Sequence, residues 1–346
     1  MTYCAGWKYR DSVCLIADTA ITKFDKPSLD YSSFGQLHSD TKDGYVQEAL
    51  LKLIPISEGI AIGYAGDVQI ASEIIELLKD NVAYAESAKD LVRFADNMGP
   101  FSTSQGVALL IASSNANGNT ELIKWDTING VDLTSADFYE IGSLNTSHSL
   151  NDILRIVTSK GISQNQMLVM ASSIFQSYGI HEDLIQKNIG GTIFGLATTQ
   201  GKISWQEDTN YVLYSNINNS ISLISTLSRD NAIIVNSSIT NDVRVFYHTI
   251  STDEAVVLDP NWRQQLKKHY ETDRFRYWIF ISIQNRVITL LIRRDLDNKS
   301  KYVRFNRLRE GEFDMELSSE LLTRLRQPLT DKKDGSIPFR LNVLFD

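Results

Sequence analysis

The order of hydrophobic periodicities along the chain is the feature that most restricts its fold. Short runs with strand-like alternation or continuous apolar character fill most of the sequence, and amphipathic helical patterns interrupt them in pairs. Strands, two helices, strands, two helices and strands follow one another. This order predicts an α+β fold of packed sheets rather than an alternating, doubly wound one. The 346 residues, 42% of them hydrophobic, suffice for a full core and suggest two domains.

Local patterns predict the individual elements of the first part of the chain. Residues 3–17 alternate around a polar break at residues 8–12 and predict a β-hairpin, whereas the polar residues 22–48 predict a long exposed loop. Asp67 and Ser87 are candidate N-caps for two consecutive helices, which end near residue 80 and at Gly99-Pro100. Further helices are expected at residues 150–160 and 166–178, and further strands at residues 50–56, 59–64, 106–112, 121–126, 138–141, 190–197 and 201–205.

The pattern changes beyond about residue 211, where short β-branched runs replace the mixture of strands and helix pairs. A boundary is therefore predicted between a first domain of residues 1–212 and a mainly-β second domain of residues 213–346. Its expected elements are strands at residues 221–227, 232–235, 243–247, 255–258, 278–283 and 286–293, and a helix at residues 318–326.

Charge also differs between the two ends of the chain. Residues 1–260 carry 16 Lys and Arg against 30 Asp and Glu, whereas residues 261–346 carry 18 against 12, so the net charges are −14 and +6. A charge run of this kind, taken alone, favours a solvated face of mixed sign. The alternatives are that the positive end meets nucleic acid, an acidic partner or the acidic body of a neighbouring copy of the chain. Nucleic-acid binding is not favoured, because the basic residues are interleaved with acidic ones.

No apolar run approaches the ~20 residues that a membrane-spanning helix needs, and the first residues lack the apolar core of a secretory signal. The sequence therefore predicts a cytoplasmic protein without a membrane partner. Cys4 and Cys14 are expected on one strand, an even number of positions apart. That spacing predicts reduced, half-buried thiols rather than a disulfide or a metal site.

Familiar catalytic and metal-binding motifs are missing from the sequence. It contains no P-loop, no GxSxG, no HExxH and no CxxC pair, and its five histidines do not have the spacing of metal ligands. Composition and pattern alone therefore indicate a two-domain α+β protein without an obvious cofactor or metal site.

Four short segments, in order from the second residue, carry a resemblance to a known family. They read Thr2-Tyr-Cys-Ala-Gly-Trp7, Asp11-Ser-Val-Cys-Leu-Ile-Ala-Asp-Thr-Ala-Ile-Thr22, Lys52-Leu-Ile-Pro-Ile56 and Ala61-Ile-Gly-Tyr-Ala-Gly-Asp67. Together they resemble the opening of proteasome β-subunits, and the start is most similar to the bacterial ancestral β-subunit (Anbu) branch. The likeness covers about residues 2–210. It implies an N-terminal nucleophile (Ntn) hydrolase fold, a four-layer αββα sandwich with two stacked antiparallel sheets between helix layers.

The resemblance gives a chemical meaning to Thr2. Removal of the initiator Met1 would leave Thr2 as the first residue, with its hydroxyl beside its own free α-amine. An α-amine has a reference pKa of ~7.7 to 8.0, so it can accept the hydroxyl proton near neutral pH without a histidine. Nucleophile and general base then belong to one residue. The expected activity is that of a threonine-type peptidase.

Other site residues are carried over from the family. Lys52 would stand close to the terminal amine and lower its pKa, and Asp18 would pair with Lys52, since an unpaired buried charge is costly. Gly63 would offer its backbone N–H to the oxyanion, because the absence of a side chain lets the substrate backbone approach closely. Ser143, after the expected strand at residues 138–141, would orient the amine.

The resemblance also implies substrate-binding residues. Thr22 matches the residue that binds the substrate main chain as an added strand. Ala61 and Ala65 match positions that line the first specificity pocket, where small residues leave room for a large substrate side chain. The implied substrate is a peptide or an unfolded protein, and no cofactor or metal is implied.

One part of the family pattern is missing near Gly190-Gly191, which matches the family's Gly-Gly. The Asp and Ser that normally precede this pair correspond to Gln186 and Ile189, so two supporting polar groups are replaced. Asp183 is a candidate substitute if the loop is one turn longer. This departure bears on the orientation of the amine and leaves Thr2 and its predicted partners intact.

Two hypotheses follow, and a third possibility combines them, with the second domain delivering substrates to the chamber or gating it. In the first, the chain is a threonine peptidase that assembles with copies of itself into a ring-like complex, with a possible separate ATPase or other partner at the second domain. In the second, the chain is a non-catalytic ring, scaffold or recognition subunit whose positively charged second domain binds the partner. Charge reversal at Arg293, Arg294, Lys299 and Lys301 would then abolish binding, whereas Thr2→Ala would leave it intact.

Overall fold

The protein divides into two compact units with a mixed α+β architecture. The first unit consists mainly of residues 1–206 and the second mainly of residues 207–346. The predicted boundary between residues 212 and 213 therefore falls inside a strand of the second unit, β14 (Thr209–Tyr214). The computed structural model describes residues 2–85, 87–97, 106–132, 136–142, 162–215, 221–229, 232–239, 242–249, 268, 274–309, 312–326 and 339–346.

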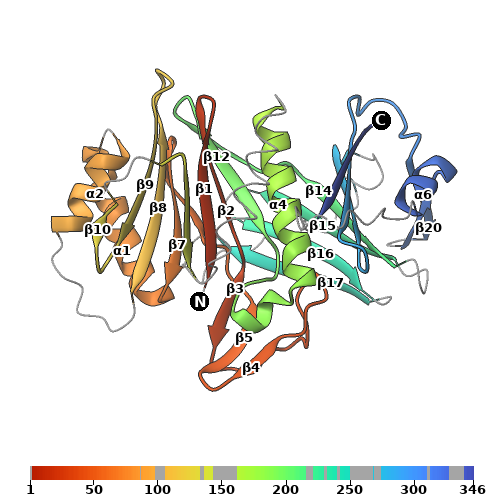
Figure 1. Ribbon diagram of the computed structural model, residues 1–346, viewed down its shortest axis with the longest axis horizontal. Coiled ribbons are helices and arrows are strands. Elements are labelled where there is room, and N and C mark those ends of the chain that lie inside the picture. Colours follow the sequence, from red (N-terminus) through yellow and green to blue (C-terminus); the bar gives the residue numbers. More distant parts are fainter. Residues whose placement is uncertain are drawn as a thin grey trace, which may run out of the picture. The chain divides into compact units, whose positions relative to one another are not determined.

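Two five-stranded antiparallel sheets form the centre of the first unit (Figure 1). Strand β1 contacts β7 and β9, and β2 contacts β8, so the sheets pack face to face. One sheet has the order β11 (Phe138–Gly142), β1 (Tyr3–Tyr9), β2 (Ser12–Ala17), β12 (Phe194–Thr199) and β13 (Lys202–Trp205). The other has the order β10 (Gly130–Val131), β9 (Thr120–Asp126), β8 (Val107–Ser114), β7 (Ile60–Gly66) and β6 (Leu53–Ser57).

Helices cover the outer faces of both sheets (Figure 1). The helices α1 (Val68–Asn81) and α2 (Ala88–Asn97) pack on the sheet that contains β7, and α4 (Gln164–His181) packs on β2 and β12. The predicted N-cap Asp67 is confirmed, because its carboxylate accepts a hydrogen bond from the N–H of Ile70. The described layers are thus helix, sheet, sheet and helix. Short 3₁₀ helices lie at Val82–Tyr84 (η1) and Leu184–Lys187 (η2).

The loop predicted at residues 22–48 is wrong. The chain folds there into a small three-stranded sheet of order β3 (Ala20–Lys23), β5 (Gly44–Glu48) and β4 (Ser39–Thr41). Between β3 and β4 the chain buries Phe34 and Gln36. The difference arises because four polar residues of this segment hydrogen-bond in the interior instead of facing water: Ser32, Ser33, Gln36 and Glu48.

The hairpin predicted at residues 3–17 is confirmed as β1 and β2, but the two cysteines differ from their expectation. Cys4 lies on β1 and Cys14 on β2, and both are free and completely buried rather than half-buried. Burial raises the pKa of both thiols, so neither is an activated nucleophile.

A seven-stranded sheet dominates the second unit. Its order is β17 (Asp242–Thr249), β16 (Ala232–Ile239), β15 (Ile221–Arg229), β14, β18 (Tyr277–Ser282), β19 (Val287–Ile292) and β22 (Arg340–Phe345). Its pairs are antiparallel in part, but β18 runs parallel to β14 and β22 parallel to β19. The described part of the unit also contains a separate hairpin, β20 (Val303–Arg309) and β21 (Glu312–Leu317), and the helix α6 (Ser319–Arg326). The sequence did not predict β20, β21 or β22.

Several expectations concern residues outside the described part of the chain. They are the helix at residues 150–160, the strand at residues 255–258, the end of the second helix at Gly99-Pro100 and the position of Ser143. Among the described helices, none is long and apolar enough to span a membrane.

Candidate active site

Asp18 is the centre of a buried polar cluster in the first unit. It follows β2 directly, its side chain is inaccessible to solvent, and each carboxylate oxygen has a separate set of donors. Oδ1 accepts hydrogen bonds from the Lys52 ammonium at 2.6 Å and from the N–H of Tyr3 at 3.2 Å. Oδ2 accepts one from the N–H of Gly190 at 3.0 Å. Three segments far apart in the sequence therefore meet at one carboxylate.

Lys52 precedes β6 and is fully buried, so its charge depends on its neighbours. Its Nζ donates to two acceptors, the charged carboxylate of Asp18 and the neutral backbone carbonyl of Ala20. Burial lowers the pKa of Lys52, whereas the carboxylate of Asp18 opposes this change through its charge and its hydrogen bond. The predicted pairing of Asp18 with Lys52 is thus present in the structure.

The start of the chain lies next to this pair. Tyr3 exchanges two backbone contacts with Asp18: its N–H donates to the carboxylate, and its carbonyl accepts from the N–H of Asp18 at 3.1 Å. Thr2, immediately before Tyr3, is only 2% exposed. The carboxylate of Asp18 therefore connects Lys52 to the amide of Tyr3, the residue after the predicted nucleophile Thr2. In the chain that still carries Met1, the nitrogen of Thr2 is an amide and not a base.

Gly63 lies in the middle of β7, opposite β1. A Cβ at this position would lie 2.3 Å from the sulfur of Cys4, so the packing of the two sheets requires glycine here. The neighbouring N–H of Tyr64 bonds the carbonyl of Lys52 at 3.2 Å on the β6 side. Because successive peptide groups of a strand point in opposite directions, the N–H of Gly63 faces β8, where Leu110 is its register partner.

This direction corrects the reason expected for glycine at position 63. The side chain that a larger residue would displace is that of Cys4, not a substrate. The geometry of the described strands also does not favour Gly63 as the oxyanion donor, since its N–H faces a neighbouring strand rather than Thr2.

The predicted substrate-binding residues fall into two groups. Thr22 is exposed and lies on β3, which is the edge strand of its small sheet among the described residues. Ala61 and Ala65 are buried, at 0% and 3% exposure, on the same face of β7 as Gly63. They therefore face the interior between the sheets and do not line an open pocket for a large side chain in this structure.

Ser143 lies outside the described residues, but its neighbour Gly142 closely approaches the predicted nucleophile. Gly142 pairs with Tyr3 at the end of β11, with φ at +103°. A Cβ at Gly142 would overlap the carbonyl oxygen of Thr2, so only glycine fits.

The residues that replace the family's Asp and Ser do not contribute polar groups to the cluster. Gln186 is exposed and bonds Asp183 at 2.5 Å, and Asp183 is exposed as well, so it does not act as a substitute. Ile189 is buried and apolar. The turn at residues 190–193 is held instead by Gln36, Glu48 and Gln176. The sequence contained no signal for these three residues, because they come from distant segments without a shared motif.

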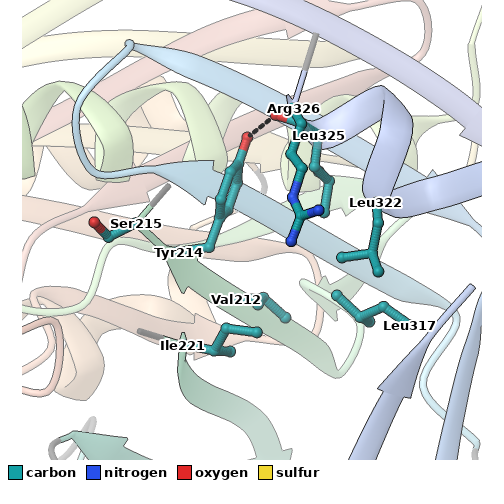
Figure 2. A pocket seen from close by; sticks show the side chains of 8 residues that line it. All are labelled: Val212, Tyr214, Ser215, Ile221, Leu317, Leu322, Leu325 and Arg326. Carbon is teal, nitrogen blue, oxygen red and sulfur yellow. Dashed lines mark hydrogen bonds between the residues drawn. The ribbon is translucent and has the colours of Figure 1, made fainter. Parts of the chain in front are cut away.

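The second unit contains a pocket of about 120 Å³ (Figure 2). Tyr214 lines the pocket, and its hydroxyl donates a hydrogen bond to the carbonyl of Leu325 at 3.1 Å. The side chain of Arg326, at the end of α6, also lines the pocket. The remaining lining is mostly apolar and consists of Val212, Ser215, Ile221, Leu317, Leu322 and Leu325.

The basic residues that were expected to form one binding surface of the second unit differ in exposure. Arg293 is 2% exposed and donates a hydrogen bond to the carbonyl of Asn298 at 2.6 Å, so it belongs to the interior. Arg294 is exposed and lies over the ring of Phe345 at 4.1 Å, and Lys299 and Lys301 are exposed. A charge-reversal test of this surface therefore has to omit Arg293.

No known protein family and no curated protein matches this sequence. Among the described residues, no group of three or more His, Cys, Asp or Glu side chains could hold a metal ion.

Proposed function

We propose that this protein is an N-terminal-threonine hydrolase of the Ntn type that cleaves peptide bonds, with Thr2 as the nucleophile after removal of Met1. One observation carries the proposal. The fully buried Asp18–Lys52 ion pair is hydrogen-bonded to the amide of Tyr3, the residue that follows Thr2. A buried ion pair adds little stability by itself, because desolvation offsets its Coulomb attraction. Its location beside Thr2 is the position from which its charge can act on a nucleophile and its amine.

In the proposed reaction, the hydroxyl oxygen of Thr2 attacks the carbonyl carbon of a peptide, and the hydroxyl proton passes to the free α-amine. The amine then protonates the leaving nitrogen, and an ester between Thr2 and the acyl part of the substrate remains. Water hydrolyses this ester with the α-amine again as the proton acceptor. The positive charge of Lys52 favours the neutral amine, and Asp18 holds that charge in place.

Substrate binding uses β3, the edge strand of its small sheet among the described residues. An extended peptide can add to this edge as a strand, which places its main chain beside Thr22 without requiring a particular sequence. Assembly of several copies into a ring, fed by a separate ATPase or other partner, is the arrangement that the resemblance suggests. Oligomeric state in solution and by electron microscopy tests this part of the proposal independently of catalysis.

Intact mass and covalent labelling test the nucleophile. We expect the purified protein to lack Met1 and to react with a peptide epoxyketone or vinyl sulfone at Thr2, and Thr2→Ala to abolish labelling. Thr323→Ala is a suitable control, because it changes an exposed threonine of α6, which belongs to the second unit. Retention of Met1, or labelling that persists in Thr2→Ala, contradicts the proposal.

A second candidate function is recognition of a partner by the second unit. The pocket beside α6 favours it, since an apolar lining with a guanidinium at its edge suits an apolar side chain next to a carboxylate (Figure 2). If recognition is the only function, Thr2→Ala leaves it unchanged, whereas Arg326→Glu at the edge of the pocket removes partner binding. Charge reversal at Arg294, Lys299 and Lys301 tests in the same way whether the exposed basic residues take part. Pull-down with wild-type and variant chains as matched baits distinguishes the two candidates.

A further inference from the structure

The turn before β12, residues 190–193, is bonded in an unusual way. Each of its four consecutive backbone N–H groups donates to the side chain of a different residue, and all four acceptors come from different parts of the first unit. The pairs are Gly190 with Asp18 at 3.0 Å, Gly191 with Gln36 at 2.9 Å, Thr192 with Glu48 at 2.7 Å and Ile193 with Gln176 at 2.8 Å.

Close packing restricts the turn further. Gly190 and Gly191 have φ values of +154° and +72°, which favour glycine. A Cβ on Gly191 would lie 2.5 Å from the hydroxyl of Thr19 and 2.8 Å from a side-chain carbon of Glu48. The turn therefore has little freedom to move without displacing its acceptors.

Glu48 makes the largest number of these contacts. One carboxylate oxygen accepts from the N–H and the hydroxyl of Thr192, at 2.7 and 2.6 Å, and from the hydroxyl of Thr19 at 3.3 Å. The other oxygen accepts from the N–H and hydroxyl of Ser33, at 2.6 and 2.5 Å. All five donors are neutral, and the residue is 6% exposed. Hydrogen bonds to a buried carboxylate are stronger than those between neutral groups, so Glu48 connects the turn firmly to β5.

The two glutamines use both ends of their side-chain amides in hydrogen bonds. Gln176 accepts from Ile193 and donates to the carbonyl of Gly191 at 2.9 Å, and it does so from α4. Gln36 accepts from Gly191 and donates to the carbonyl of Gly179 at 3.0 Å. The amide of Gln176 therefore bridges two residues of the turn from α4, whereas the amide of Gln36 joins the turn to the backbone at Gly179.

We propose that Gln36, Glu48 and Gln176 are positioning residues for the Asp18–Lys52 pair. They hold the turn so that the N–H of Gly190 binds Oδ2 of Asp18, which leaves Oδ1 for Lys52 and the amide of Tyr3. The inference rests on the proposed function. In this chain these three residues supply the polar support that Gln186 and Ile189 do not give.

Glu48→Gln tests the proposal with a change of nearly constant volume. The new side chain has an NH2 group in place of one oxygen. This NH2 group must face the donors of either Ser33 or Thr192, so the hydrogen bonds to that residue are lost. We expect the maximal rate of epoxyketone labelling at Thr2 to fall about 10- to 100-fold, the effect of a small misplacement of reacting groups, with little change in the probe concentration for half-maximal rate. The pH midpoint of labelling is expected to shift, because the charge of Lys52 moves relative to the amine.

Glu58→Gln is the matched control. It makes the same chemical change at an exposed residue of the turn between β6 and β7, and it should leave the labelling rate and its pH midpoint unchanged. Thr192→Val provides a second variant if Glu48→Gln does not fold. It removes one hydroxyl donor, keeps the backbone N–H, and should give a smaller loss of rate in the same direction.

Hydrogen exchange at the amides of residues 190–193 gives a readout that does not depend on activity. Faster exchange there in Glu48→Gln, together with the slower labelling, supports the proposal. Labelling of Glu48→Gln at the wild-type rate and with the wild-type pH midpoint overturns it while leaving the proposed function intact. Absence of labelling in the wild-type chain without Met1 overturns the proposed function and this inference together.

Discussion

The first unit buries an ion pair, Asp18 and Lys52, with both side chains at 0% exposure, whereas the interior of the second unit is mainly aromatic and aliphatic. Trp278, Phe280 and Leu291 belong to one continuous apolar cluster on its seven-stranded sheet. Arg293 is also buried there, but it bonds a backbone carbonyl within a turn. An apolar core gives stability without the desolvation cost of a buried charge. That cost, which Asp18 and Lys52 carry in the first unit, supports the proposal that the pair has a chemical role.

The largest expected effect concerns this ion pair. Lys52→Met leaves the carboxylate of Asp18 buried without its cation, and we expect the unfolding free energy of the first unit to fall by about 3–5 kcal/mol. Hydrogen exchange along a urea titration measures each unit separately. The control is Lys79→Met, which breaks an exposed pair with Glu76 and should cost at most about 1 kcal/mol. Equal losses of unfolding free energy in Lys52→Met and Lys79→Met would contradict a larger cost for leaving the buried carboxylate of Asp18 unpaired.

The second unit should respond to loss of apolar volume instead. Leu291→Ala removes a fully buried side chain of the aliphatic and aromatic cluster, and it should destabilise this unit by about 2–5 kcal/mol. Ile283→Ala is the control, because Ile283 is 41% exposed in the turn between β18 and β19. A loss below about 1 kcal/mol in Leu291→Ala would show that the cluster does not determine the stability of the second unit.

The packing of the two sheets in the first unit is tested by Gly63→Ala. The added methyl group meets the sulfur of Cys4, and overpacking of this kind costs about 1–3 kcal/mol. Cys4→Ala removes the sulfur, so the double variant should lose less stability than the sum of the two single variants. Urea unfolding of all four chains measures the coupling. Additive effects would mean that the methyl group finds space elsewhere.

The smallest expected effect is a pH dependence at Glu140, which accepts a hydrogen bond from the hydroxyl of Tyr3 at 2.6 Å. Burial raises the pKa of Glu140 above its ordinary 4.5, and the hydrogen bond from Tyr3 opposes this only in part. Between 4.5 and the raised value the folded state holds the proton more tightly than the unfolded state. The contribution of Glu140 to stability is therefore complete at low pH and is lost as the pH rises through this window.

Glu140→Gln removes this titration while keeping an acceptor for Tyr3. Its stability relative to the wild-type chain should therefore rise between about pH 4 and about pH 7, as measured by urea unfolding at both pH values. A stability difference that stays constant over this range, or moves the other way, contradicts the raised pKa of Glu140.

Local patterns in the sequence determined much of the first unit, because the interactions that define those elements are short in range. The hairpin of β1 and β2, the cap of α1 by Asp67 and the strand pair of β6 and β7 follow from alternation and from capping within a few residues. The pairing of Asp18 with Lys52 was expected only through the resemblance of four segments. It is present in the structure, while the chemistry assigned to Thr2 stays a prediction.

Only the tertiary structure decided the residues around that pair. Glu48 and Thr192 are 144 positions apart, and Gln36 and Gly191 are 155 apart, so no local pattern reveals their contacts. The small sheet at residues 20–48 was missed for the same reason, since polar side chains in a sequence do not show whether their partners are water or distant backbone. The sequence determines which groups are available for hydrogen bonding. The packing of sheets and turns decides which of them meet, because long-range contacts depend on the whole fold.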